Sequence, residues 1–382
     1  MDAQVTGEIL RVLKSMPEPR RHNTRHKLID ILTIALLAVI CGADGWVAVV
    51  VYAQRKEAWL RGFLELPAGI PAHDTFGRVF ARLNPQAFEG CFLQWISALV
   101  DVSGGQLVAI DGKSLRRSFE NGWDKCGMAH MVSAFVEANA LVFAQIKTDG
   151  KGRELDAIEQ LVRLLDLEGA VVTIDALGCN TRIAGLIVEA KADYVLQVKG
   201  SQPTLHAKLQ TLFAEAVMEN LQGYRSDTYQ TTDGGHGRIE TRVITVLWDV
   251  KHLGALAREW PGLKSVAQVV CTREVPGPDG FKKSTEHHYY ITTLDRRKKA
   301  RQFLGYTRGH WSVENNLHWQ LDVSFHEDQR RIRKDHGPEN FSRLCRIALN
   351  LLKNEKTQKT GIAIKRQACG WDNQYLLTVV AG

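Results

Sequence analysis

Two short β-branched runs that each end in an aspartate constrain the fold of this chain most strongly. The first is Val108–Asp111 (VAID) and the second is Val172–Asp175 (VTID). A charge at the tip of a buried strand is costly unless it is paired or serves a site. The repeated ending therefore suggests that both aspartates serve one site.

The order of the surrounding segments predicts how these two runs lie in space. Three strands, a helix, a strand, a helix and a strand are predicted over 106–111, 130–137, 141–148, 154–167, 170–175, 180–191 and 193–200. Three leading strands form a meander, and right-handed helical crossovers join the later ones. We therefore expect an α/β fold with a mixed five-stranded sheet whose first and fourth strands are neighbours. Asp111 and Asp175 then lie together at the carboxyl ends of parallel strands, where such sheets place their sites.

Two carboxylates held close together favour a bound cation, because they repel one another without one. Hard oxygen ligands point to Mg²⁺ or Mn²⁺. A two-metal site for phosphoryl transfer needs a further acidic group from a neighbouring element. Glu314, on a predicted helix between Trp311 and Trp319, is the candidate for this third ligand.

A different metal site is also compatible with the residues around Glu314. His310, Glu314 and His318 recur at every fourth position, so they share one helical face and could hold zinc or iron. The spacing is not the HExxH pattern of zinc proteases. This alternative also leaves both strand-end aspartates unexplained, so we favour the carboxylate site.

The rest of the chain predicts a division into domains. Residues 1–100 are expected to be all-helical, residues 101–355 to form the α/β domain, and residues 356–382 to be a tail. A β-rich insertion is expected at about 201–297. The apolar run 31–43 is shorter than the roughly 20 residues that span a bilayer, which favours a buried helix. Asp74 is expected to cap the helix that follows it.

The amino-acid composition indicates the cellular compartment and the kind of binding partner. The net charge of +7 and the pI near 9.0 favour a polyanionic partner. The seven cysteines are scattered and form no CxxC pair, which is typical of reduced thiols in a cytosol. The first residues do not have the pattern of an export signal. We therefore expect a cytoplasmic protein that does not enter a membrane.

Seven blocks in the same order resemble the H repeat-associated family of bacterial insertion-sequence transposases, a branch of the DDE transposases. The resemblance runs from about residue 10 to 355. The blocks are IPAHDTFGRVFARLNP, VAIDGKSLRRS, VVTIDALGCN, YVLQVKGSQPTL, HGRIETR, RGHWSVENNLHWQLDVSFHED and RIALNLLK. It implies an RNase H-like catalytic domain, an N-terminal transposase-associated domain over residues 1–100 that binds DNA, and a DNA substrate. It also implies that Asp111, Asp175 and Glu314 are catalytic residues and metal ligands.

A transposase grips the phosphate backbone through many basic contacts. Lys113, Arg116 and Arg117 follow Asp111 directly and are the leading candidates for contacts with double-stranded DNA. Other candidates lie in the HGRIETR and RGHWSVENN blocks: His236, Arg238, Arg308 and His310. The resemblance further implies a dimer on paired element ends.

The predicted activity is Mg²⁺-dependent transposition, in which the element ends are cut and the freed 3′-hydroxyl is joined to target DNA, with two ions at the site. Two alternatives remain. One is a nuclease on the same sheet that joins nothing, and the other is a DNA-binding relative that has no catalytic activity.

Overall fold

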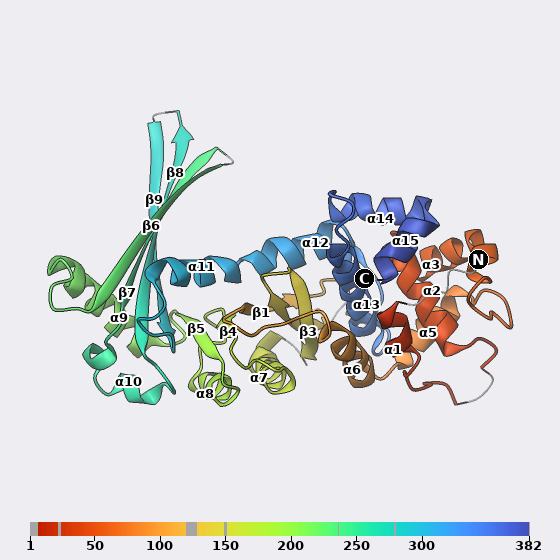
Figure 1. Ribbon diagram of the computed structural model, residues 1–382, viewed down its shortest axis with the longest axis horizontal. Helices are drawn as coiled ribbons and strands as arrows, with labels where there is room; N and C mark the ends of the chain where they lie inside the picture. The colour runs from red at the N-terminus through yellow and green to blue at the C-terminus, as the bar shows by residue number, and fades with distance from the viewer. Residues whose placement is uncertain are drawn as a thin grey trace. The chain divides into compact units, whose positions relative to one another are not determined.

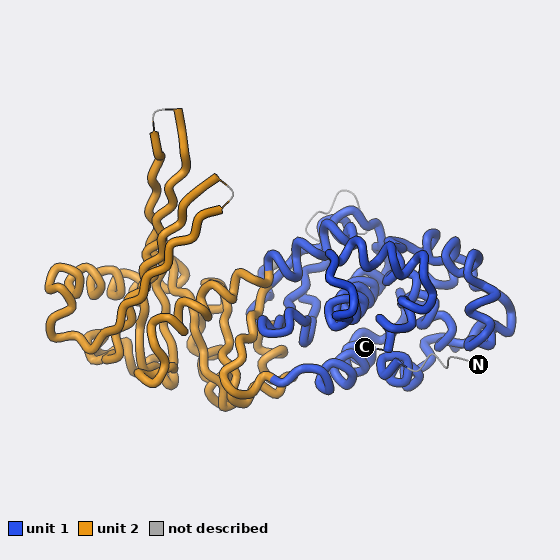
Figure 2. Tube along the Cα trace, turned by 45° about the horizontal axis from the view of Figure 1, so that its top comes forward, with its two compact units in different colours: residues 1–101, 112–157, 314–382 blue, residues 102–111, 158–313 orange. Residues whose placement is uncertain are grey.

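A computed structural model describes residues 7–21, 24–119, 128–148, 151–235, 237–278 and 280–381 (Figure 1). The chain forms two compact units (Figure 2). Unit 1 comprises residues 1–101, 112–157 and 314–382, and unit 2 comprises residues 102–111 and 158–313. Both units are therefore assembled from segments that lie far apart in the sequence.

Unit 2 is built on a mixed sheet. Its strands follow the order β1-β4-β5-β9-β8-β7-β6. Their bounds are β1 Leu107–Ser114, β4 Val171–Ile174, β5 Asp193–Val198, β6 Ser226–Gly235, β7 Arg238–Leu247, β8 Ser265–Gly277 and β9 Gly280–Thr292. β1, β4 and β5 are parallel, whereas β9, β8, β7 and β6 continue the sheet as antiparallel strands.

The helices of unit 2 lie between these strands in the sequence. They are most of α7 Glu154–Leu164, then α8 Thr181–Glu189, α9 Pro203–Met218, α10 Leu256–Glu259 and α11 Ala300–His310, with a 3₁₀ turn at Val250–Leu253. α11 packs on β4, β6 and β7. Its Phe303 and Leu304 are buried with Val171 of β4 and Ile244 of β7 in one apolar cluster. Burial of this apolar surface holds α11 on the sheet.

The β-rich segment after residue 201 extends the main sheet instead of forming a separate layer. β5 and β9 pair with Val195 opposite Thr292, so the segment joins at the edge of the parallel strands. Figure 1 shows β6 to β9 as a long antiparallel group. β6 has a largely polar sequence, SDTYQTTDGG, and was not expected from hydrophobic periodicity.

Unit 1 is mainly helical. Its helices are α1 Glu8–Leu13, α2 Leu28–Ile40, α3 Trp46–Arg55, α4 Glu57–Leu60, α5 His73–Arg82, α6 Pro85–Ile96, α12 Trp319–Val323, α13 Gly337–Asn354, α14 Ile362–Trp371 and α15 Asn373–Ala381. It also holds the hairpin β2 His130–Val136 and β3 Leu141–Thr148, together with short turns at Lys151–Arg153, Glu314–His318 and Glu327–Gln329. α13 packs on α2, α5, α6 and β3.

Two expectations about helices in unit 1 have different outcomes. The apolar run 31–43 was expected to be a buried helix, and α2 is buried from Asp30 to Ile40. Asp74 was expected to be an N-cap, and this is wrong. Ala72 is the N-cap of α5, because the helix begins at His73, two residues earlier than an Asp74 cap requires, and the Asp74 amide donates to Nδ1 of His73 at 2.9 Å.

Residues after 355 form α14 and α15, which pack on α13. Buried Glu355 holds this end of the chain. It accepts from Tyr375 Oη at 2.7 Å and pairs with Lys365 Nζ at 3.0 Å. Burial alone would raise the pKa of Glu355, but hydrogen bonds from Thr357, Tyr375 and Lys365 outweigh it and lower the pKa to about 2.

No helix among the described residues is long and apolar enough to cross a membrane. The cysteines in the described part of the chain are free thiols: Cys41, Cys91, Cys179, Cys271, Cys345 and Cys369. Cys126 lies outside the described residues.

Candidate active site

The two strand aspartates occupy matching positions on neighbouring parallel strands. β1 and β4 pair in register as far as Ile110 opposite Ile174, and Asp111 and Asp175 are the next residues. Both side chains are half-buried. The predicted adjacency of these strands is confirmed. β4 ends at Ile174, whereas β1 continues to Ser114, because its far end belongs with β2 in unit 1.

The backbone after β4 fixes the Asp175 carboxylate. Oδ1 accepts the amide of Leu177 at 3.0 Å and that of Gly178 at 3.4 Å. A Cβ atom on Gly178 would lie 2.1 Å from Cγ2 of Ile174, so only glycine fits this turn. The turn uses Oδ1 and leaves Oδ2 for other interactions.

An acid–imidazole pair formed by buried His130 and half-buried Glu154 lies against the residue that follows Asp111. His130 Nε2 is 2.6 Å from Glu154 Oε1, and His130 Nδ1 is 2.9 Å from Ser114 Oγ. A Cβ atom on Gly112 would lie 2.7 Å from His130 Nε2, so the pair touches the backbone next to Asp111. Sequence reasoning missed this pair, although a histidine opening an otherwise apolar strand was a signal.

Glu314 begins a π-helical turn, Glu314–His318, that follows α11. Its side chain is exposed, whereas Val313 and Leu317 are fully buried. Trp311 and Trp319 on either side are 48% and 53% exposed, so they are not core residues. Glu314 belongs to unit 1, whereas Asp111 and Asp175 belong to unit 2.

His310, Glu314 and His318 do not share one helical face, because the π-helical turn interrupts the four-residue spacing. His310 is buried and its Nδ1 lies 3.1 Å from Thr173 Oγ1 on β4. His326 Nδ1 lies 2.7 Å from Asp44. Within the described residues, no three His, Cys, Asp or Glu side chains are already grouped so that they could hold a metal ion.

Two of the three basic residues after Asp111 have acidic partners. Lys113, whose side chain is 11% exposed, pairs with Asp322 and lies 3.9 Å from Asp328. Arg116 pairs with Asp328 at 3.1 Å. Burial raises the pKa of Asp328, although Lys113 opposes the rise. Arg117 is exposed, and its carbonyl accepts from Arg333 Nε at 3.2 Å.

The remaining DNA-contact candidates lie on unit 2. Arg238 pairs with Glu240 at 2.9 Å, and Arg308 pairs with Asp233 at 3.1 Å. His236 lies outside the described residues. DNA contact by these residues, by buried His310 and by the three cations after Asp111 stays a prediction.

Comparison with known proteins identifies the family to which the chain belongs. Residues 103–351 match the family described as Transposase DDE domain, and residues 10–96 match the family described as DDE_Tnp_1-associated. The first match covers β1, β4 and the Glu314 segment together.

Individual relatives extend over nearly the whole chain. "Putative transposase YncI" of Escherichia coli O157:H7 is 37% identical over 374 residues, which are 98% of this chain and 94% of that protein. "H repeat-associated putative transposase YhhI" of Escherichia coli strain K12 is 36% identical over 357 residues, 94% of this chain and 93% of that protein. The chain therefore belongs to the DDE transposase family, among the H repeat-associated transposases.

One solved structure shows a much weaker likeness. The piggyBac transposase synaptic complex with hairpin DNA aligns with a TM-score of 0.39 and 10% identity, over 96% of this chain and 76% of that chain. A likeness of this size supports no argument about fold or function.

Proposed function

We propose that this transposase cuts the ends of an insertion sequence and joins the freed 3′-hydroxyl to target DNA through one acidic site. The observation that carries the proposal is the register of β1 and β4, which puts Asp111 and Asp175 on adjacent strands at the same level. An RNase H-like arrangement of the sheet, a dimer on paired ends and action in the cytoplasm belong to the same proposal.

The donor set on these strands fits a divalent ion. Two half-buried carboxylates on neighbouring strands offer hard oxygen ligands, which Mg²⁺ and Mn²⁺ prefer. The turn at Asp175 holds one carboxylate oxygen and leaves the other for a ligand. Asp111, Asp175 and Glu314 are proposed to hold two ions. When bound, such ions supply positive charge to the phosphate oxygens and lower the pKa of an attacking hydroxyl.

The position of α11 supports the inclusion of Glu314. His310, the last residue of α11, contacts Thr173, which lies two residues before Asp175. Glu314 follows His310 by four residues, which is about one helical turn of chain. The segment that carries Glu314 thus begins four residues after a side chain that contacts β4.

The protein's own part in the reaction is to position and hold reactants. In the first step water attacks the phosphorus at the element end, and the 3′ oxygen leaves with a proton. In the second step that 3′-hydroxyl attacks target phosphorus, loses its proton and displaces the target 3′ oxygen. His130 and Glu154 keep the backbone beside Asp111 in place, and no bond between enzyme and DNA forms.

A joining assay tests the proposal directly. Wild-type protein, Mg²⁺ and DNA carrying pre-cut element ends should give a joined product with a target duplex. A nuclease would hydrolyse the target and join nothing, and a non-catalytic relative would bind DNA without any metal-dependent product. Either of these outcomes contradicts the proposed function.

A further inference from the structure

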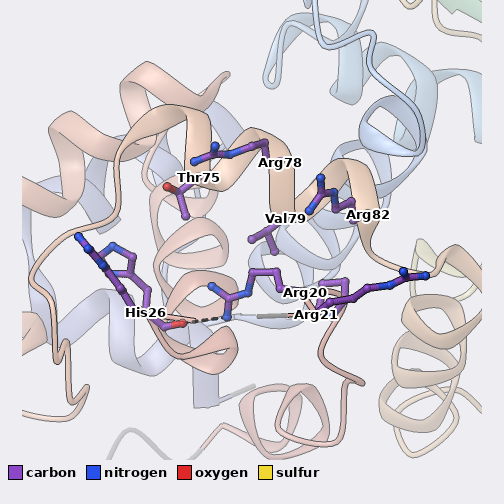
Figure 3. Close-up of a pocket in the computed structure, with 9 residues that line it drawn as sticks. Arg20, Arg21, His26, Thr75, Arg78, Val79 and Arg82 are labelled. Atoms are coloured by element: carbon purple, nitrogen blue, oxygen red, sulfur yellow. Dashed lines mark hydrogen bonds between the residues drawn. The ribbon is translucent and has the colours of Figure 1, made fainter. Parts of the chain in front are cut away.

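A basic cleft lies on unit 1, between α5 and the segment that leads to α2 (Figure 3). Its volume is about 830 Å³. The lining residues are Pro19, Arg20, Arg21, Arg25, His26, Thr75, Arg78, Val79 and Arg82. Buried Val79 belongs to the core face of α5, whereas Arg78 and Arg82 lie on its solvent face. Among the described residues, no acidic side chain lines the cleft.

Arg20 holds the wall opposite α5 in place. Its guanidinium bonds both carboxylate oxygens of Glu18, at 2.6 and 2.8 Å, and donates to the carbonyl of His26 at 2.8 Å. Figure 3 shows this last bond beside the cleft. The charge of Arg20 is therefore compensated, and its role in the cleft is structural.

Four other arginines line the cleft, and none of their guanidinium groups pairs with a carboxylate of the described residues: Arg21, Arg25, Arg78 and Arg82. Like charges gathered in this way repel one another unless an anion is present. The pKa of His26 is lowered mainly by burial; Arg20 and Arg25 lower it further, whereas a hydrogen bond with the Gly69 backbone and the charge of Asp30 oppose the shift.

We propose that this cleft binds the phosphate backbone of duplex DNA. Arginine is suited to this role, because its planar guanidinium donates two parallel hydrogen bonds to a phosphate. Arg78 and Arg82 stand about 6 Å apart along α5, and each strand of a duplex presents a phosphate about every 3.4 Å along the axis. Both side chains can thus reach phosphates of one strand. The inference rests on the proposed function for its DNA partner.

Exposure favours a polymer over a small phosphate compound. Sites for small ligands enclose most of the ligand surface. Here all four unpaired arginines are exposed, so the cleft is open along its charged side. A duplex lying across the cleft would contact several of them at once. His22 and Asn23, between the two parts of the wall, lie outside the described residues, and the site does not depend on them.

Salt dependence of binding tests the proposal. The full-length chain is titrated with a duplex of about 30 base pairs, roughly three helical turns, by fluorescence anisotropy in EDTA so that no cutting occurs. For the double variant Arg78→Ala, Arg82→Ala, the slope of log affinity against log salt should become shallower by about 1.8, or about 0.9 for each lost phosphate contact. An unchanged slope would refute the proposal.

Two further variants separate the cleft from charge and folding in general. Arg55→Ala with Arg61→Ala removes the same charge from exposed positions of unit 1 outside the cleft, and should leave the slope near that of wild type. Arg78→Lys with Arg82→Lys keeps the charge and should retain most of the slope. An equal loss in the Arg55/Arg61 variant would mean that net charge, not the cleft, determines binding.

A competition experiment with a small anion identifies the ligand of the cleft. Inorganic triphosphate should compete with the duplex only weakly. Tight triphosphate binding that the Arg78/Arg82 variant abolishes, with an unchanged duplex slope, would assign the cleft to a free polyphosphate and overturn the proposal. Because these measurements need no metal, they can fail while the joining assay succeeds, and the reverse is also possible.

Discussion

Asp175→Ala should abolish metal-dependent cutting and joining while DNA binding is retained. The substitution removes one of two carboxylates on adjacent strands, so the remaining oxygens hold divalent ions poorly. Loss of a residue that only supports a metal ligand costs about 10- to 100-fold. We therefore expect loss of the ligand itself to exceed about 100-fold in the cutting rate. Gel assays of cutting and anisotropy measurements of binding give the two quantities.

Asp166→Ala is the matched control. Asp166 is an exposed aspartate of unit 2 that lies before β4, whereas Asp175 follows the strand. Its loss should leave cutting and joining near wild-type rates. Asp111→Ala and Glu314→Ala should behave like Asp175→Ala. Cutting retained by a folded Asp175→Ala protein would exclude the acidic site.

Arg346→Ala should destabilise unit 1 by about 3–5 kcal/mol, because removal of one partner leaves the other charge buried. Arg346 is fully buried on α13, and its Nη1 lies 3.1 Å from Glu327 Oε1 and 3.1 Å from the carbonyl of Ser342. Glu327 is itself buried. Urea unfolding followed by circular dichroism measures the change in the free energy of unfolding.

Two variants separate the buried charge from a general loss of arginine. Arg61→Ala breaks a half-exposed pair with Glu57 at 2.7 Å and should cost only about 0.3–0.5 kcal/mol. Glu327→Met combined with Arg346→Met removes both charges and should recover much of the stability. If Arg346→Ala unfolds no earlier than Arg61→Ala, Glu327 is not held as a buried anion.

The dependence of the free energy of unfolding on acid pH should change as well. Burial alone would raise the pKa of Glu327, but Arg346, Arg330 and Lys113 outweigh it and lower the pKa. A carboxyl group whose pKa is lowered by folding stabilises the folded protein at pH values above its pKa in the unfolded chain, about 4.3. This stabilisation is lost as the pH falls through the lower pKa of the folded protein. The contribution should shrink in Arg346→Ala.

The strand pattern was enough to predict the centre of the fold. The short β-branched runs indicate which residues are strands. The order of the elements and the right-handed crossovers between them then indicate that β1 and β4 are neighbours. The apolar stretch that became α2 was equally predictable, because a helix that is apolar on every face must be buried.

Features that depend on contacts between distant segments were not predictable. β6 is a strand although its sequence is polar, because pairing with β7 supplies its hydrogen bonds. The pair formed by His130 and Glu154 joins the first residue of β2 to the first residue of α7, with β3 between them in the sequence. Residues 356–382, expected to be a tail, form helices that pack on α13. Glu355 holds them there, because it accepts a hydrogen bond from Tyr375 and forms an ion pair with Lys365.

The most direct test of the account asks whether Asp111, Asp175 and Glu314 bind the same ions. Fe²⁺ substituted for Mg²⁺ and treated with ascorbate and peroxide cuts a polypeptide near its ligands. With DNA bound, a site shared by the three residues should give cuts near residues 111, 175 and 314, all suppressed by excess Mg²⁺ and all lost in Asp175→Ala. Cuts near residues 111 and 175 without any near residue 314 would contradict it.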